Sequence, residues 1–151
     1  MDLKDKIRSI EDYPQKGVIF RDITTLLKDA EGLKGAVDAI TASLADVSFD
    51  LVLSPESRGF IFGMPVAYNM GKGFVPVRKA GKLPAETISK EYELEYGKAT
   101  IEIHKDAIKP GQKVVIVDDL MATGGTAKAI MEMVEEMGAE VVASAFLIEL
   151  D

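Results

Sequence analysis

The segment Val114–Ile130, which reads VVIVDDLMATGGTAKAI, constrains the possible folds more strongly than any other part of the chain. Its first four residues are all apolar, as in a buried strand of a parallel sheet. Two acids and a glycine-rich stretch interrupt this run, and the apolar residues that follow return at helical spacing. The segment therefore predicts a strand, an anion-binding type of loop and a helix in direct succession.

The same alternation of strands and helices extends over the chain. Leu33, Val37, Ile40 and Leu44 recur at helical spacing, and FDLVL at 49–53 is typical of a buried strand. Alternation of this kind predicts an α/β fold in which helices flank a parallel central sheet. The other expected elements are an N-terminal helix with Leu3, Ile7 and Ile10 on one face, a helix at 60–69 that Pro65 kinks or delays, strands at 74–77, 113–117 and 141–148, and a helix that Gly138 ends.

The region between the predicted strands at 74–77 and 113–117 has a different pattern. Residues 79–90 show no periodicity and hold Gly81 and Pro84 among charges, which indicates a mobile loop. Polar and apolar residues then alternate at 91–95 and 100–104, on either side of Gly97. This alternation predicts an antiparallel hairpin.

Composition sets limits on the location and the class of the protein. A chain of 151 residues with 47% hydrophobic residues is long enough for one domain with its own core. No apolar run approaches the roughly 20 residues of a membrane span, and the N-terminus does not begin like a signal peptide, so we expect a cytoplasmic protein. The net charge of −7 argues against nucleic-acid binding, and the absence of cysteine excludes thiolate chemistry.

Positive charge is concentrated in one part of this acidic chain. Residues 57–85 contain no Asp or Glu, although acids make up 25 of the 151 residues. The same window contains Arg58, Lys72, Arg78, Lys79 and Lys82. Such a strip is typical of a local site for a small anion, but a solvated lysine loop gives the same pattern.

The acids and the glycine-rich loop together indicate a ligand with two different ends. Backbone N–H groups of the loop and the hydroxyls of Thr123 and Thr126 suit a phosphate, whereas Asp118 and Asp119 suit two neighbouring hydroxyl groups. The patterns GxxxxGK[ST] and GxGxxG after a strand are both absent. Ribose 5-phosphate has the required form.

The motif also resembles that of a known family. Four apolar residues, two acids, a short spacer and ATGGT resemble the phosphoribosyl-pyrophosphate signature of the type I phosphoribosyltransferases. The segments GVIFRDITTLLKD (17–29), ESRGFIFG (56–63), VPVRKAGKLP (75–84) and the whole of 94–126 resemble the adenine-specific branch of that family. The resemblance implies transfer of a phosphoribosyl group from phosphoribosyl pyrophosphate to adenine, which gives AMP and pyrophosphate with the help of Mg²⁺. It also implies a cytoplasmic homodimer that binds neither nucleic acid nor membrane.

The resemblance further implies an organisation of the domain and a role for each site residue. We expect a small N-terminal hood at about 1–30 together with the chain end, a core at about 31–151, and a flexible loop at about 79–99 with an antiparallel hairpin flap. The ribose and its 5-phosphate are assigned to Asp118, Asp119, Ala122, Thr123, Gly124, Gly125 and Thr126. Pyrophosphate is assigned to Glu56, Ser57, Arg58, Arg78, Lys79 and Lys82, and the base to Ile19, Phe20, Arg21, Glu95, Tyr96 and Leu150. The catalytic set is Glu95, Arg58, Lys79 and Lys82, while Mg²⁺ is held through ligand and water near Asp118 and Asp119 rather than directly.

Several of these assignments have alternatives. The residues alone favour a core side chain for Phe20 and ordinary hairpin-end positions for Glu95 and Tyr96, and Glu56 serves equally well as a loop-bracing carboxylate. Two other functions are compatible with the signature: transfer to another nucleobase, or a non-catalytic regulator that senses phosphoribosyl pyrophosphate. Family members also usually continue with a G-R-x-K-L element, whereas this sequence ends at Asp151.

Overall fold

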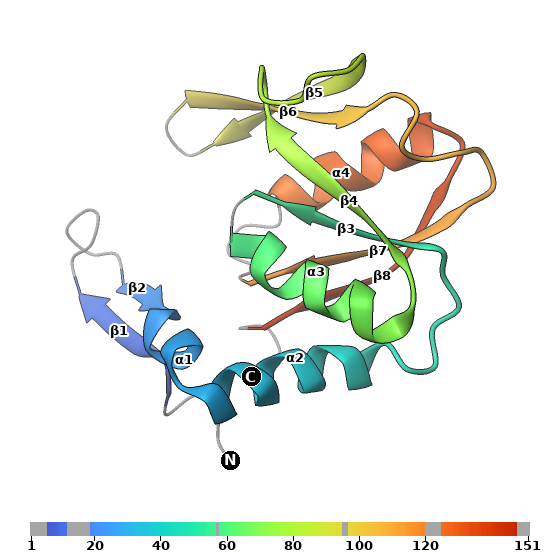
Figure 1. Ribbon diagram of the computed structural model, residues 1–151. Coiled ribbons are helices and arrows are strands. Elements are labelled where there is room, and N and C mark those ends of the chain that lie inside the picture. The colour runs from blue at the N-terminus through green and yellow to red at the C-terminus, as the bar shows by residue number, and fades with distance from the viewer. Residues whose placement is uncertain (1–5, 12–18, 57, 95–96, 120–124, 148–151) are drawn as a thin grey trace.

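The computed structural model describes residues 6–11, 19–56, 58–94, 97–119 and 125–147 (Figure 1). Six strands form one sheet in the order β5-β6-β4-β3-β7-β8. Four of them are parallel neighbours: β4 (Gly73–Lys79), β3 (Leu51–Pro55), β7 (Lys113–Asp118) and β8 (Glu140–Phe146). The parallel central sheet that the sequence predicts is therefore present, and it is extended by two antiparallel strands.

The apolar run in β7 is explained by burial on both faces of the sheet. Val115 and Val117 belong to one hydrophobic cluster, and Val114 and Ile116 belong to a second cluster on the opposite face. All four residues are at most 1% exposed. Side chains alternate across a strand, so a strand that is covered on both faces needs apolar residues at every position.

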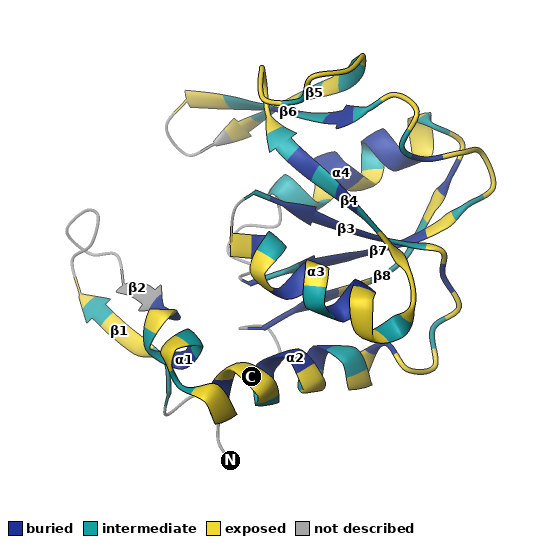
Figure 2. Cartoon of the chain, viewed as in Figure 1, coloured by how far each residue is buried: buried dark blue, intermediate teal, exposed yellow. Residues whose placement is uncertain are grey.

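Helices cover the two faces of the sheet, as Figure 1 shows. The helices α2 (Ala30–Ser43) and α3 (Arg58–Met70) pack on the face that contains Val115 and Val117. The helix α4 (Gly125–Glu136) packs on the other face through Ile130, Met133 and Val134. Buried residues accordingly follow the inner sides of these helices and the central strands (Figure 2).

The antiparallel hairpin is a continuation of the sheet. Its strands β5 (Thr87–Leu94) and β6 (Gly97–His104) pair along their whole length, and β6 joins β4 at Arg78↔Glu102 and Lys79↔Ile101. The hairpin is longer than the sequence predicts, so the loop that precedes it narrows from 79–90 to residues 80–86. The side chains Ile101 and Ile103 anchor β6 in the core that α4 covers.

The N-terminal region is small and lies to one side of the sheet (Figure 1). The strands β1 (Arg8–Glu11) and β2 (Ile19–Asp22) pair antiparallel, and the short helix α1 (Thr24–Lys28) follows. The predicted N-terminal helix is therefore wrong over the described residues 8–11. Arg8 forms an ion pair with Asp22 across the two strands, and the Asp22 carboxylate also accepts a hydrogen bond from Thr24 N–H at 2.9 Å.

Two boundaries differ from the predicted ones for local reasons. The helix α3 begins at Arg58 and contains Pro65, so the proline does not delay its start. Gly63 lies where α3 crosses β3, and a Cβ atom there would be 2.0 Å from Ser54 Oγ. The strand β3 continues through Ser54 to Pro55, two residues beyond the predicted end. Among the described residues, none of the helices combines the length and the apolar character needed to cross a bilayer.

Candidate active site

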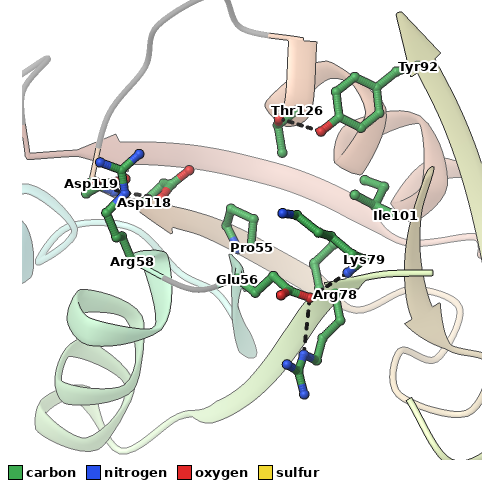
Figure 3. A pocket seen from close by; sticks show the side chains of 11 residues that line it. Pro55, Glu56, Arg58, Arg78, Lys79, Tyr92, Ile101, Asp118, Asp119 and Thr126 are labelled. Atoms are coloured by element: carbon green, nitrogen blue, oxygen red, sulfur yellow. Dashed lines mark hydrogen bonds and ion pairs between the residues drawn. The ribbon is translucent and has the colours of Figure 1, made fainter. Parts of the chain in front are cut away.

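A cavity of about 230 Å³ lies where the parallel strands β3, β4 and β7 reach their carboxyl ends (Figure 3). Loops after adjacent parallel strands meet at this edge of an α/β sheet, which is where ligands bind in such folds. The described residues that line the cavity are Pro55, Glu56, Arg58, Val77, Arg78, Lys79, Tyr92, Ile101, Asp118, Asp119 and Thr126. The structure thus brings together Glu56, Arg58, Arg78, Lys79, Asp118, Asp119 and Thr126, all of which the sequence singles out.

One side of the cavity is acidic. Asp118 ends β7, and its Oδ1 accepts a hydrogen bond from the backbone N–H of Asp119 at 2.7 Å. Burial, followed by the neighbouring Asp119 carboxyl, raises the pKa of Asp118 to about 8. Asp118 therefore holds a proton over much of the neutral range in the ligand-free protein.

Asp119 has an available acceptor in spite of its burial. Its side chain is 5% exposed, and Arg58 Nε lies 3.1 Å from its Oδ2. This contact is an ion pair without hydrogen-bond geometry, because Oδ2 accepts no hydrogen bond from the described residues. A buried carboxylate oxygen with unused acceptor capacity is suited to a ligand hydroxyl or to a metal-bound water.

Gly59 allows the start of α3 to approach this acid pair closely. A Cβ atom at Gly59 would lie 2.9 Å from Asp118 Oδ1 and 3.1 Å from Pro55 Cδ. Any side chain at this position would push α3 away from the end of β7. The glycine of the RGF sequence therefore sets the short distance between Arg58 and the acids.

The other side of the cavity is cationic and is organised around one carboxylate (Figure 3). Glu56 Oε1 accepts a hydrogen bond from Lys79 N–H at 2.6 Å and pairs with Arg78 Nε at 3.3 Å. Its Oε2 pairs with Lys82 Nζ at 3.1 Å. Burial alone would raise the pKa of Glu56, but the hydrogen bonds from Lys79 and Lys82 and the charges of Lys82 and Arg78 lower it overall. Glu56 is thus a charged brace of the loop, which is one of the two roles that the sequence leaves open.

Tyr92 is a lining residue that sequence reasoning missed. Its hydroxyl is 3.0 Å from Thr126 Oγ1 and joins β5 of the hairpin to the first turn of α4 (Figure 3). The only signal in the sequence is the alternation at 91–95, which puts Tyr92 on the face opposite Glu91 and Glu93. Pro55, Val77 and Ile101 were missed as well. All three are buried, and Val77 and Ile101 belong to the hydrophobic core.

Several predicted site residues lie outside the described residues. These are Ser57, Glu95, Tyr96, Ala122, Thr123, Gly124 and Leu150. Gly125 begins α4, and Ile19, Phe20 and Arg21 contribute backbone to β2, where they pair with Glu11, Ile10 and Ser9. Lys82 contacts Glu56 from the loop beyond β4 and is half exposed.

The acid pair fits Mg²⁺ as an indirect partner. Carboxylate oxygens are the ligands that this ion prefers, and Asp119 Oδ2 accepts no hydrogen bond from the described residues. No group of three or more metal-binding side chains occurs within the described ranges. Two carboxylates are too few for a protein cage but are suited to an ion that keeps its water and is carried by a phosphate ligand.

Comparison with known proteins identifies the class. The model of the phosphoribosyl transferase domain matches residues 24–150. The chain therefore belongs to the phosphoribosyltransferase family.

Individual relatives narrow this to one branch. The adenine phosphoribosyltransferase of Agathobacter rectalis is 62% identical over 148 residues, which are 98% of this chain and 85% of the relative. The crystal structure of adenine phosphoribosyltransferase from Thermoanaerobacter pseudethanolicus matches with a TM-score of 0.92 and 55% identity over 95% of this chain and 84% of that one. The Saccharomyces cerevisiae enzyme, in complex with adenine and an imino-altritol 1,6-bisphosphate, matches with a TM-score of 0.89 and 40% identity over 95% and 84% of the two chains. These relatives confirm the predicted type I fold, and within the family the chain falls among the adenine phosphoribosyltransferases.

Proposed function

We propose that this protein transfers the 5-phosphoribosyl group of phosphoribosyl pyrophosphate to N9 of adenine, forming AMP and pyrophosphate in purine salvage. One observation carries the proposal: a single cavity has a pair of acids on one side and the cations Arg78, Lys79 and Lys82 on the other. A sugar with vicinal hydroxyls and a highly charged leaving group matches these two sides. The relatives that this chain resembles are named for the same reaction.

The acids bind the sugar in this proposal. Asp118 and Asp119 accept hydrogen bonds from the 2- and 3-hydroxyls of the ribose. The amino end of α4, together with Thr126, holds the 5-phosphate, because backbone N–H groups and the helix dipole stabilise an anion there. Residues 122–125 complete this subsite through the resemblance stated above.

The cations bind and stabilise the leaving group. Arg58, Arg78, Lys79 and Lys82 approach from three different segments and neutralise the charge that develops on pyrophosphate as the bond to ribose C1 breaks. Ser57 contributes its backbone. Mg²⁺, when bound beside Asp118 and Asp119, supplies additional charge neutralisation for the same anion.

The base is bound by residues of the N-terminal hood and the hairpin tip. Phe20 stacks on adenine with Ile19 beside it, Arg21 reads the edge of the ring through its backbone, and Leu150 lines the pocket. Glu95 shares a proton with N7, and Tyr96 excludes water. These roles rest on the resemblance of GVIFRD and LEYGK to the family motifs and, for Leu150, on its match to the apolar family residue near the last strand.

We further propose that the enzyme is a homodimer in the cytoplasm. Three large apolar side chains, Ile61, Met64 and Tyr68, lie at helical spacing on α3 and are 39%, 53% and 84% exposed. Such a stripe is suited to burial by a partner chain. The same helix begins at Arg58, so a dimer contact there would also stabilise one wall of the cavity.

The test is an assay of AMP formation from phosphoribosyl pyrophosphate and adenine. Parallel reactions contain hypoxanthine, guanine or uracil, each with Mg²⁺ or with EDTA. We expect AMP from adenine with Mg²⁺, little product from the other bases, and strong loss of rate with EDTA. Product from another base instead of adenine would support the alternative transferase, and binding of phosphoribosyl pyrophosphate without any product would support a sensing role.

A further inference from the structure

The contact between Tyr92 and Thr126 joins two parts of the site that are far apart in the sequence. Tyr92 lies on β5, and Thr126 lies in the first turn of α4. The two hydroxyl oxygens are 3.0 Å apart, and both residues line the cavity. Either oxygen is able to donate in the ligand-free protein.

The position of the Tyr92 hydroxyl is fixed by its surroundings. The ring is partly buried against the hydrophobic cluster under α4. Two residues earlier on the same face of β5, Lys90 Nζ pairs with Glu132 at 3.1 Å and with Glu136 at 3.0 Å, both on α4. The strand is therefore fastened to the helix at two points, and the tyrosine hydroxyl has a defined place beside Thr126.

A bound phosphate removes the ambiguity in the direction of this hydrogen bond. A hydroxyl group has one hydrogen to donate and two lone pairs, whereas a phosphate dianion only accepts. If Thr126 gives its hydrogen to the 5-phosphate, its oxygen is able only to accept from Tyr92. The result is a chain in which Tyr92 donates to Thr126 and Thr126 donates to the phosphate, and hydrogen bonds in such a chain strengthen one another.

We propose that Tyr92 is a positioning residue for the 5-phosphate subsite: its hydroxyl orients the Thr126 hydroxyl so that the hydrogen of Thr126 points at the phosphate. This role rests on the proposed function, which supplies the phosphate ligand. Tyr92 itself does not touch the reacting atoms. Its effect is confined to ligands that carry a 5-phosphate.

The experiment measures the Kd of AMP and of pyrophosphate by calorimetry for the wild type and for Tyr92→Phe. AMP uses the 5-phosphate subsite, while pyrophosphate uses the cationic side. We expect Tyr92→Phe to raise the Kd of AMP by about 3- to 10-fold, the usual effect of losing one hydrogen bond in a charged network. The Kd of pyrophosphate should stay within about twofold. Thr41→Val is the control, because it removes a hydroxyl that donates to the Val37 carbonyl oxygen within α2 and does not line the cavity.

A double-mutant cycle separates positioning from a general structural role. Thr126→Val removes the group through which Tyr92 acts, so Tyr92→Phe should have no further effect on AMP in that background. Thr126→Ser keeps the hydroxyl and should keep the sensitivity to Tyr92→Phe. Equal losses for AMP and pyrophosphate, additive losses in the cycle, or an unchanged Kd of AMP would each overturn the proposal.

Two further outcomes keep this inference distinct from the proposed function. A wild-type protein that does not bind AMP would contradict the function itself. A wild-type protein that binds AMP, with a Tyr92→Phe variant of equal affinity, would contradict only the role of Tyr92. If circular dichroism shows that Tyr92→Phe does not fold, Thr126→Ser is compared with Thr126→Val instead. An equal Kd of AMP for these two variants would mean that the Thr126 hydroxyl does not contribute to binding, and this would also overturn the proposal.

Discussion

Two carboxyl groups in the same cavity, Glu56 and Asp118, have opposite electrostatic states. Glu56 is 9% exposed at its side chain and is surrounded by Arg78, Lys82 and the N–H of Lys79, which lower its pKa. The pKa of Asp118 is raised to about 8 by burial and by its acidic neighbour. Burial raises the pKa of both groups, but the cations and the N–H group that face Glu56 oppose this effect, whereas the neighbouring Asp119 carboxyl adds to it at Asp118.

This difference describes the ligand-free state of the site. On the cationic side, the Glu56 carboxylate pairs with positive groups that we assign to pyrophosphate. On the acidic side, Arg58 lies against Asp119, and Asp118 retains a proton. Binding of substrate is therefore an exchange of partners on both sides, and each side is open to a separate test.

Removal of the acidic side should have the largest effect. The double substitution Asp118→Asn and Asp119→Asn replaces both carboxyl acceptors by amides and removes the negative charge that pairs with Arg58 at Asp119. Hydrogen bonds to charged groups are roughly twice as strong as neutral ones. We expect the KM for phosphoribosyl pyrophosphate to increase by about 100-fold or more, since two such contacts are lost together. Steady-state kinetics measure this. The control is Asp38→Asn, an acid in an exposed ion pair with Lys34 on α2; an unchanged KM in the double variant would reject the diol role.

Neutralisation of Glu56 should have a smaller effect in the opposite direction. Glu56→Gln keeps an acceptor for Lys79 N–H but releases Arg78 and Lys82 from an anion with which pyrophosphate has to compete. We expect the Kd of pyrophosphate to decrease by about 3- to 10-fold, the scale of one partly buried ion pair.

Glu102→Gln is a well-matched control for this substitution. Glu102 braces the same loop through Gly81 N–H at 2.7 Å and Thr87 Oγ1 at 2.9 Å, and no cation among the described residues pairs with it. Its substitution should leave the Kd of pyrophosphate unchanged. Weaker binding in Glu56→Gln would mean that Glu56 holds the cations in place for pyrophosphate rather than competing with it.

The contrast between the two sides was only partly predictable from the sequence. The acids, the glycine-rich loop and the cationic strip are contiguous patterns, and the α/β alternation places the loops after parallel strands at one edge of the sheet. The carboxylate that pairs with the cationic strip, Glu56, was not predictable in the same way. Glu56 meets Arg78 and Lys82 because β3 and β4 are parallel neighbours in register at Pro55↔Val77. The register between two strands cannot be deduced from the sequence of either strand alone.

The errors have a common physical origin in contacts between distant segments. Leu3, Ile7 and Ile10 have helical spacing, but the strand pairing of β1 with β2 and the Arg8–Asp22 ion pair determine the structure at 8–11. Local propensity is a weak prior that tertiary contacts override. Tyr92 was missed for the same reason, because its partner Thr126 is 34 residues away.

The last expected effect concerns stability rather than ligand binding and isolates Asp118 from any ligand. In the metal-free protein, the pKa of Asp118 is about 8 in the folded state, compared with an ordinary value of 3.8 that applies to the unfolded state. Between these values the folded state binds a proton that the unfolded state lacks, so the free energy of unfolding falls as the pH rises through this range. Asp118→Asn removes this contribution, and the variant should gain stability relative to wild type as the pH increases from 5 to 8, by about 1 kcal/mol or more.

Urea unfolding in EDTA at pH 5, 6.5 and 8 measures this difference, with Asp38→Asn as the exposed control. At pH 5 the side chain at 118 is uncharged in both folded proteins, so the difference in the free energy of unfolding there is the reference value. Any increase above that value at pH 8 reports the cost of ionising Asp118 next to Asp119. Curves that stay parallel over the whole range would mean that the Asp118 carboxyl ionises freely in the folded protein, and that the two sides of the cavity differ less than their geometry indicates.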